Sequence, residues 1–214
     1  LSTSGLWPNL RQRPFDTVAN SNALPDAIFV TATNTHPLAA NPYDLVKNRN
    51  DDIKSGLKAM CELSDGKVYL NVNDEESWKD SLIPEVEVHT FNGPHPAGNV
   101  GVHINTLHPV NMERRVWHID IQNLADIGFF LNSGILPTQR VVAIVGPAAI
   151  EPKLIQTRHG ADIETFKNYA KPNSRFVSGS VLSGATANPG EPYGYLSRYA
   201  QQISILNDSL DNMT

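Results

Sequence analysis

The chain has a single cysteine, no long apolar run and no excess of basic residues. One thiol, Cys61, cannot form an intrachain disulfide, and it cannot supply a zinc or iron–sulfur site that needs several cysteines. No stretch approaches the ~18 apolar residues of a membrane span. The 17 Lys and Arg are outnumbered by 22 Asp and Glu, which gives a net charge of −5. A chain of this charge lacks the basic face that phosphate backbones require, so no nucleic-acid partner is expected.

The motifs that hold nucleotides are also missing. Gly93 and Gly98 have the separation of the two P-loop glycines, but Asn99 and Val100 stand where that loop needs Lys and Ser or Thr. The dinucleotide fingerprint should follow the first strand, and residues 34–37 (NTHP) contain no glycine there. The serine-hydrolase motif G-x-S-x-G is absent as well. The sequence predicts no catalytic residues and no bound FMN or NADH.

Four histidines fall within 24 positions: His95, His103, His108 and His118. The separation of His103 and His108 is five residues, which does not match the four-residue spacing of a helical zinc site. Histidines that donate to backbone carbonyls explain this group as well as metal ligation does. No metal site is therefore predicted.

The first part of the chain has the pattern of a parallel βαβ unit. Residues 27–32 are a short apolar, β-branched run that predicts a buried strand, and the alternation in residues 67–72 predicts a second strand. Residues 51–63 between them have helical spacing, with Asp51 as the expected cap. Further strands are predicted at residues 86–90 and 116–119. Asp120 then predicts the cap of a second helix, which Gly134 ends. This order is typical of a Rossmann-like α/β fold.

The pattern changes near Leu136. Strands are predicted at residues 140–145, 153–157 and 175–178, with a short helix at residues 162–169. Hairpin, helix and strand in this order are the outline of a small β-grasp domain. We therefore predict a mixed α/β (α+β) protein with a degenerate Rossmann-like domain at 1–137, a β-grasp domain at 138–190 and a C-terminal extension at 191–214.

The segment 93–101 between the third and fourth strands is rich in glycine and proline. Such a composition predicts a rigid loop of defined shape that presents His95 and backbone groups at a surface. The alternative is an internal buttress in which His95 only bonds to neighbouring carbonyls. The candidate residues for ligand binding or for an interface are Gly93, Pro94, His95, Pro96, Gly98, Asn99 and His103.

Residues 91–104 read FNGPHPAGNVGVHI and closely resemble the F-x-G-P-H-P-A-G-x-x-G-x-H-I signature of the family of A subunits of sodium-translocating NADH:quinone oxidoreductases. Four further stretches agree with the family and follow its order. They are residues 27–39 (AIFVTATNTHPLA), 116–119 (VWHI), 140–142 with Gly146-Pro147, and 178–184 (SGSVLSG). The first residue is Leu1, so we expect an excised fragment that lacks the family's N-terminal and C-terminal regions.

This resemblance implies a role in a respiratory enzyme complex of several subunits. Other subunits would carry NADH, FMN, FAD and the iron–sulfur centre, while the complex reduces ubiquinone and exports sodium ions. The fragment would be a soluble, peripheral part on the cytoplasmic side of the bacterial inner membrane. It would contribute to quinone reduction and to assembly with the other subunits, without a cofactor of its own. The resemblance also implies a Rossmann-like fold followed by a β-grasp domain of the soluble-ligand-binding type.

Two other functions compete with this interpretation. In the first, the chain is a small-ligand binding module that takes quinone and has no catalytic residues. In the second, it is a free-standing flavin or nicotinamide enzyme, and the missing glycine fingerprint argues against that hypothesis.

Overall fold

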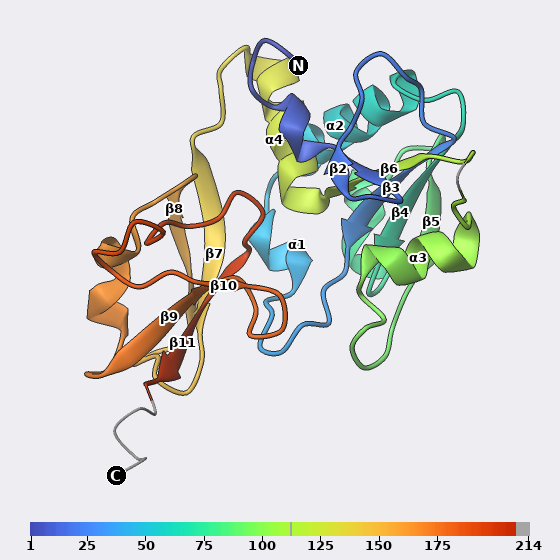
Figure 1. Cartoon of the computed structure of the whole chain (residues 1–214). Helices are drawn as coiled ribbons and strands as arrows, with labels where there is room; N and C mark the ends of the chain where they lie inside the picture. The colour runs from blue at the N-terminus through green and yellow to red at the C-terminus, as the bar shows by residue number, and fades with distance from the viewer. Residues whose placement is uncertain (112, 209–214) are drawn as a thin grey trace. The chain divides into compact units, whose positions relative to one another are not determined.

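The computed structural model describes residues 1–111 and 113–208, which form two compact units (Figure 1). Unit 1 contains residues 1–35 and 41–137, and unit 2 contains residues 36–40 together with the chain from 138 onward. Each unit has its own sheet and its own apolar core. No helix in the described ranges has both the length and the apolar content needed to cross a bilayer.

Unit 1 is a six-stranded sheet with the order β2-β1-β6-β3-β4-β5. Its strands are β1 (Arg11–Arg13), β2 (Thr17–Val18), β3 (Ala27–Ala32), β4 (Lys67–Val72), β5 (Glu87–Thr90) and β6 (Val116–Asp120). The last four are parallel to one another, whereas β1 pairs antiparallel with both β2 and β6. The parallel strands are joined by crossovers, as a βαβ pattern requires.

Helices cover both faces of this sheet. The longer helices α2 (Asn50–Glu62) and α4 (Ile121–Ser133) lie together on one face, where they close the main apolar core (Figure 1). The eight-residue helix α3 (Val100–Leu107) lies on the opposite face over a smaller apolar cluster (Figure 1). The remaining short helices of unit 1 are η1 (Trp7–Asn9), α1 (Pro42–Leu45) and η2 (Glu76–Ser81).

The parallel strands and the second long helix agree with the sequence prediction. Asp120 caps α4 by accepting a hydrogen bond from the Asn123 backbone N–H at 3.0 Å, and Gly134 ends the helix with φ +71°. The prediction of Asp51 as the cap of α2 was wrong. That helix begins at Asn50, and the residue in the capping position is Arg49, whose side chain makes no capping bond.

Two further features were not predicted. Helix α3 begins at Val100, inside the segment that was predicted to be irregular. Near the N-terminus, η1 is followed by β1, a strand that no sequence pattern predicted and that extends the sheet beside β6.

The turn between β1 and β2 is held by a charged cluster around Asp16. The carboxylate of Asp16 accepts a hydrogen bond from His118 Nε2 at 2.9 Å and lies 3.2 Å from the Arg11 guanidinium. The hydrogen bond from His118 and the charges of Arg13 and Arg11 lower the pKa of Asp16 to about 2. Asp16 itself has φ +52°, a conformation that Asp tolerates better than most residues. The cluster therefore fixes this turn against β6.

We expect unit 1 to lose stability in acid through Asp16. Because its folded pKa is lowered, its contribution is fully present above the unfolded value near 3.8 and disappears as the pH falls through about 2. Solvent screens a side chain that is 45% exposed, so the expected contribution is about 1 kcal/mol. In urea unfolding, the free energies of unfolding of wild type and Asp16→Asn should differ by that amount at pH 7. The two free energies should become nearly equal near pH 2. An equal difference at both values would contradict this assignment.

Unit 2 is a five-stranded mixed sheet with the order β10-β9-β11-β7-β8. Its strands are β7 (Gln139–Val145), β8 (Lys153–Arg158), β9 (Ser174–Ser178), β10 (Ala185–Thr186) and β11 (Gln202–Asn207), and the helical turn η3 (Ile163–Tyr169) precedes β9. Strands β7 and β8 form an antiparallel hairpin, and β11 runs parallel to β7 in the centre of the sheet. A mixed sheet with one helical turn over it is the expected β-grasp outline.

The central strand of unit 2 comes from the end of the chain. The segment 191–214 was predicted to be a C-terminal extension, yet β11 within it pairs with both β7 and β9. Ile203 and Ile205 on this strand are fully buried in the core of the unit. The part of residues 191–214 beyond Asp208 lies outside the described chain.

Candidate functional site

The carboxyl ends of the parallel strands in unit 1 meet at one edge of the sheet. After β3 the chain builds β4 and β5 on one side, and it then returns to place β6 on the other side of β3. Ligands of open α/β sheets bind outside the carboxyl ends of the strands, where the strand order reverses in this way. The residues after β3 and the 93–101 loop after β5 both belong to this edge.

Thr35 anchors the 93–101 loop. Its Oγ1 accepts a hydrogen bond from the Gly98 backbone N–H at 2.9 Å, and the same oxygen lies 3.3 Å from His95 Nδ1. Gly98 is buried so close to this segment that a Cβ there would stand 2.6 Å from the Thr35 nitrogen. Only glycine allows this approach. The loop is therefore fastened at its centre to the segment that follows β3.

His103 supports the loop from the helix that follows it. Its side chain is fully buried, and its Nε2 donates a hydrogen bond to the Ala97 carbonyl at 3.0 Å. The ring of His103 also packs on Phe91 with 4.2 Å between ring centroids. Burial lowers the pKa of His103, so the ring is neutral and acts here as a structural donor.

The other candidate residues of the loop are more exposed. Gly93 adopts φ +136°, which an L side chain rarely accepts, and Pro94 and Pro96 face solvent. Asn99 occupies the capping position of α3, and its side chain makes no capping bond to that helix. The loop thus combines a buried anchor at Gly98 with an exposed surface at its two prolines.

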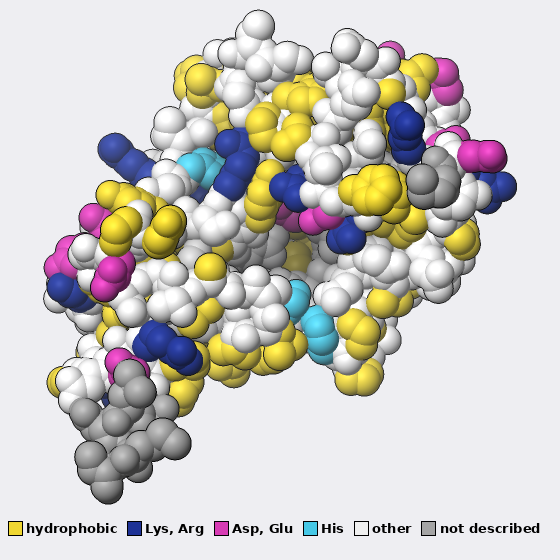
Figure 2. Space-filling view, viewed as in Figure 1, with side chains coloured by type: hydrophobic (Ala, Val, Ile, Leu, Met, Phe, Trp, Pro, Cys, Tyr) yellow, Lys and Arg dark blue, Asp and Glu magenta, His cyan; other side chains and the backbone are white. Residues whose placement is uncertain are grey.

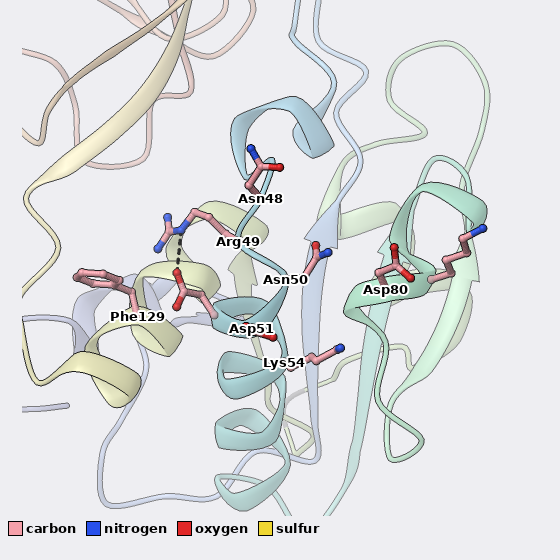
Figure 3. Close-up of a pocket in the computed structure, with 9 residues that line it drawn as sticks. Asn48, Arg49, Asn50, Asp51, Lys54, Asp80 and Phe129 are labelled. Carbon is pink, nitrogen blue, oxygen red and sulfur yellow. Dashed lines mark hydrogen bonds and ion pairs between the residues drawn. The ribbon is translucent and has the colours of Figure 1, made fainter.

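A groove of about 790 Å³ lies at the start of α2 (Figure 3). It is lined by Asn48, Arg49, Asn50, Asp51, Asp52, Lys54, Lys79, Asp80 and Phe129. Arg49 bonds there with Asp52 at 3.1 Å and with the buried Asp126 at 2.8 Å. Three of the lining residues are cationic and three are acidic. Because its charges balance, the groove does not select a ligand of either sign.

Comparison with known proteins matches each of the two units to a known family model. The family model described as the NqrA second alpha/beta domain matches residues 1–136, and the model described as the NQRA C-terminal domain matches residues 141–188. The chain belongs to the NqrA family. This confirms the resemblance seen in the sequence, and it confirms the fold class of a Rossmann-like domain followed by a β-grasp domain.

Curated NqrA proteins match nearly the whole chain. The NqrA subunit of a Na(+)-translocating NADH-quinone reductase from Shewanella amazonensis is 43% identical over 213 residues, which are 99% of this chain and 47% of that protein. Relatives with the same name from Histophilus somni and Vibrio anguillarum are 41% and 42% identical, over 96% and 99% of this chain. These matches cover 46% and 47% of the two relatives. The chain thus spans about half the length of these relatives.

A solved structure shares the fold at low sequence identity. A chain of the NAD+-reducing [NiFe]-hydrogenase in its H2-reduced state superposes with a TM-score of 0.60 and 11% identity, over 86% of this chain and 40% of that one. This likeness supports the architecture of the NqrA chain.

The structure brings some of the candidate residues together in this NqrA site. His95, Gly98 and His103 converge on Thr35 and Ala97, whereas Gly93, Pro94 and Pro96 remain at the loop surface. Sequence reasoning missed Thr35 and Phe91 as the partners of this loop. Thr35 lies 60 positions before His95 in the chain, and no local signal connects them. Across residues 1–111 and 113–208, no group of three or more His, Cys, Asp or Glu side chains is placed to hold a metal ion.

Proposed function

We propose that this chain works within a sodium-translocating NADH:quinone reductase, as part of the peripheral NqrA subunit on the cytoplasmic side of the bacterial inner membrane. In that complex, electrons pass from NADH to ubiquinone while sodium ions are exported, and this chain contributes to quinone reduction and to assembly. The observation that carries the proposal is the match of two NqrA family models, in chain order, to both units.

The chain supplies no redox group of its own in this proposal. The segment after β3, where a Rossmann fold holds a cofactor phosphate, contains no glycine, and its Thr35 is bonded to the 93–101 loop. Basic side chains on the face in Figure 2 lie in separate small groups, which does not favour a binding surface for phosphate-rich ligands. In this proposal, partner subunits carry NADH, FMN, FAD and the iron–sulfur centre.

Purification of the intact complex tests the proposal. An affinity tag on the native subunit that contains this chain should recover NADH-dependent, sodium-stimulated quinone reduction from solubilised membranes. Untagged membranes carried through the same column provide the control. Recovery of the tagged subunit without flavin-containing partners and without this activity would refute the proposal.

The alternative role as a quinone-binding module rests on the 93–101 loop. This loop is fastened by Thr35 and His103 but leaves His95 half-buried at the carboxyl edge of the sheet. A fixed loop with an accessible side chain suits the positioning of a ring ligand, since little conformational entropy remains to be lost on binding.

Replacing His95 distinguishes positioning of a ligand from support of the loop. The 3.3 Å contact between His95 Nδ1 and Thr35 Oγ1 is long for a hydrogen bond and lies on a half-buried side chain, so its loss in His95→Ala should cost about 0.5 kcal/mol of stability. Thr35→Val leaves the buried Gly98 N–H without its acceptor, so we expect the free energy of unfolding to fall by about 2 kcal/mol. Unfolding can be followed by tryptophan fluorescence, because Trp7, Trp78 and Trp117 all lie in unit 1.

The same two variants should be assayed in the assembled complex. If His95 positions a ligand, His95→Ala lowers quinone reduction while the stability of the chain stays close to wild type. A His95→Ala chain as unstable as Thr35→Val, in a complex with unchanged quinone reduction, would show that His95 is only a buttress.

A further inference from the structure

Asn92 and Gly93 form the only Asn-Gly pair in the sequence. They lie at the start of the segment that joins β5 to α3 (Figure 1). In such a pair, the glycine nitrogen can attack the side-chain amide carbon of the asparagine and form a five-membered imide ring. Glycine favours this reaction because it has no Cβ to obstruct the approach. In a folded protein, the reaction also requires that the structure leaves both groups free to meet.

The structure holds neither of the two reacting groups. Asn92 and Gly93 are both exposed. No described residue makes a hydrogen bond with the Asn92 side chain or with the Gly93 backbone N–H. The pairing of β5 with β4 continues as far as the Phe91 N–H, which donates to the Val72 carbonyl at 2.8 Å. Asn92 is therefore the first residue beyond the hydrogen bonds of the sheet.

The space beside Gly93 is open. A Cβ built on this residue would meet only the Ala97 side chain among the described residues, at 3.7 Å. The φ of Gly93 is +136°, a value that L side chains rarely adopt, so the position requires glycine. The backbone conformation that shapes the start of the loop therefore also keeps an unhindered nitrogen next to Asn92.

Asn105 provides a contrast in the same part of the chain. It is also exposed, but it lies within α3 and is followed by Thr106. A backbone N–H in the body of a helix donates to the carbonyl of the preceding turn, so this nitrogen is held away from the Asn105 side chain. Thr106 also has a side chain that is branched at Cβ, which obstructs the approach. Exposure alone therefore does not make an asparagine reactive.

We infer that Asn92 is a site of spontaneous deamidation, which is independent of the function proposed above. The Gly93 nitrogen forms a bond to Asn92 Cγ and loses its proton to solvent. The bond from Cγ to the amide nitrogen breaks, and ammonia leaves with a proton taken from solvent. Water then opens the imide ring at either of its two carbonyls. One opening gives aspartate, and the other gives isoaspartate, in which the main chain runs through Cβ.

The isoaspartate product acts on the anchors of the 93–101 loop. It inserts one extra main-chain atom between Phe91, whose ring packs on His103, and Gly98, whose N–H is bonded to Thr35 Oγ1 at 2.9 Å. Gly98 is packed against the Thr35 backbone and has no room to shift toward it. We therefore expect the isoaspartate form to have a lower Tm than the unmodified chain. The aspartate product only adds a negative charge at an exposed position, and its Tm should stay close to that of wild type.

The test ages the folded chain in mildly alkaline buffer, which promotes loss of the N–H proton. Trypsin releases residues 80–114 as one fragment, so Asn92, Asn99 and Asn105 are compared in a single mass spectrum. Electron-transfer fragmentation locates the modified residue, and isoaspartyl methyltransferase measures the isoaspartate. Asn92 should be modified several times faster than Asn99 or Asn105, at a rate in the folded chain similar to that in urea.

Two variants separate the site from the rest of the fragment. Asn92→Gln keeps the amide but requires a six-membered imide, which forms more slowly, so this chain should stay unmodified. Asn105→Gln is the matched control at an exposed position, and its Asn92 should react at the wild-type rate. The deamidated fraction has one negative charge more than the net charge of −5, so anion exchange isolates it for thermal unfolding. Asn92→Asp, freshly purified, provides the same charge without the inserted atom.

Three results would overturn the inference. Modification of Asn92 in urea but not in the folded chain would show that the folded loop keeps the two groups apart. An equal yield of isoaspartate in Asn92→Gln and wild type would place the reaction elsewhere in the chain. A Tm of the isoaspartate form equal to that of Asn92→Asp and wild type would show that the inserted atom does not disturb the loop anchors.

Discussion

Replacing Gly128 by alanine should destabilise unit 1 by about 3 kcal/mol, the largest loss that we expect from a change of one methyl group. A Cβ at this position in α4 would lie 1.7 Å from the Asp52 carbonyl oxygen and 2.9 Å from the Gly56 nitrogen, both in the backbone of α2. Backbone atoms cannot turn aside as a side chain can, so the two helices must separate. The gain of ~1 kcal/mol in helix propensity from glycine to alanine offsets only part of this cost.

Gly101→Ala is the matched control for this substitution. Gly101 is also helical, in α3, but it is exposed and a Cβ there would meet nothing within 4 Å. We expect its stability to stay constant or to rise by up to ~1 kcal/mol. Tryptophan fluorescence during thermal unfolding would record Gly128→Ala as a fall in Tm of about 10 °C. A Gly128→Ala chain as stable as wild type would show that α2 and α4 do not pack at this distance.

The elements that the sequence predicted well are those with strong local signals. Residues 27–32 and 67–72 form β3 and β4 as expected, because short, mostly apolar segments with β-branched residues suit strands that are buried on both faces. Asp120 and Gly134 mark the ends of α4 through contacts within a few residues of the chain. The wrong cap at Asp51 shows the limit of such signals, since a first-turn acid resembles a capping residue in sequence.

The missed elements depend on partners that are distant in the chain. The polar strand β1 carries no alternation of its own, and it forms because Arg11–Arg13 pairs with β6 more than 100 positions later. Helix α3 has apolar residues at Val100, Ile104 and Leu107, but the glycines and prolines before it favour a loop. Strand β11 is stabilised by pairing with β7, to which it is not adjacent in sequence.

The candidate site also combines features that local sequence signals predict with features that depend on residues distant in the chain. The composition of residues 93–101 predicts a loop with restricted backbone freedom. In the structure, two positions of this loop require glycine: Gly98 because a Cβ would clash with Thr35, and Gly93 because its φ is +136°. The alignment of three polar side chains across neighbouring strands could not be predicted, because the register of the strands decides that Thr31, Asn71 and His89 lie side by side. A polar residue within a strand is common, and only the register turns three of them into a row.

Replacing Arg49 by methionine should destabilise unit 1 by about 3 kcal/mol through the loss of a partly buried cation. Arg49 lies 2.8 Å from the carboxylate of Asp126, which is 1% exposed, and 3.1 Å from that of Asp52. It connects the start of α2 to the middle of α4 and lines the groove in Figure 3. Removal of one partner from a buried ion pair is costly because the remaining carboxylate loses its counter-charge but stays desolvated.

A double-mutant cycle isolates the energy of this pair. Asp126→Asn removes the negative charge, so Arg49→Met should cost about 2 kcal/mol less in that background than in wild type. Lys67→Met is the control, because it breaks an exposed ion pair with Glu87 at 2.7 Å in the same unit and should leave stability unchanged. The free energies of unfolding of the cycle variants and of the Lys67→Met control are measured by urea unfolding with tryptophan fluorescence. If Arg49→Met costs the same with and without the Asp126 charge, the guanidinium stabilises the unit by packing over α2 and α4, and the ion pair between the helices contributes nothing.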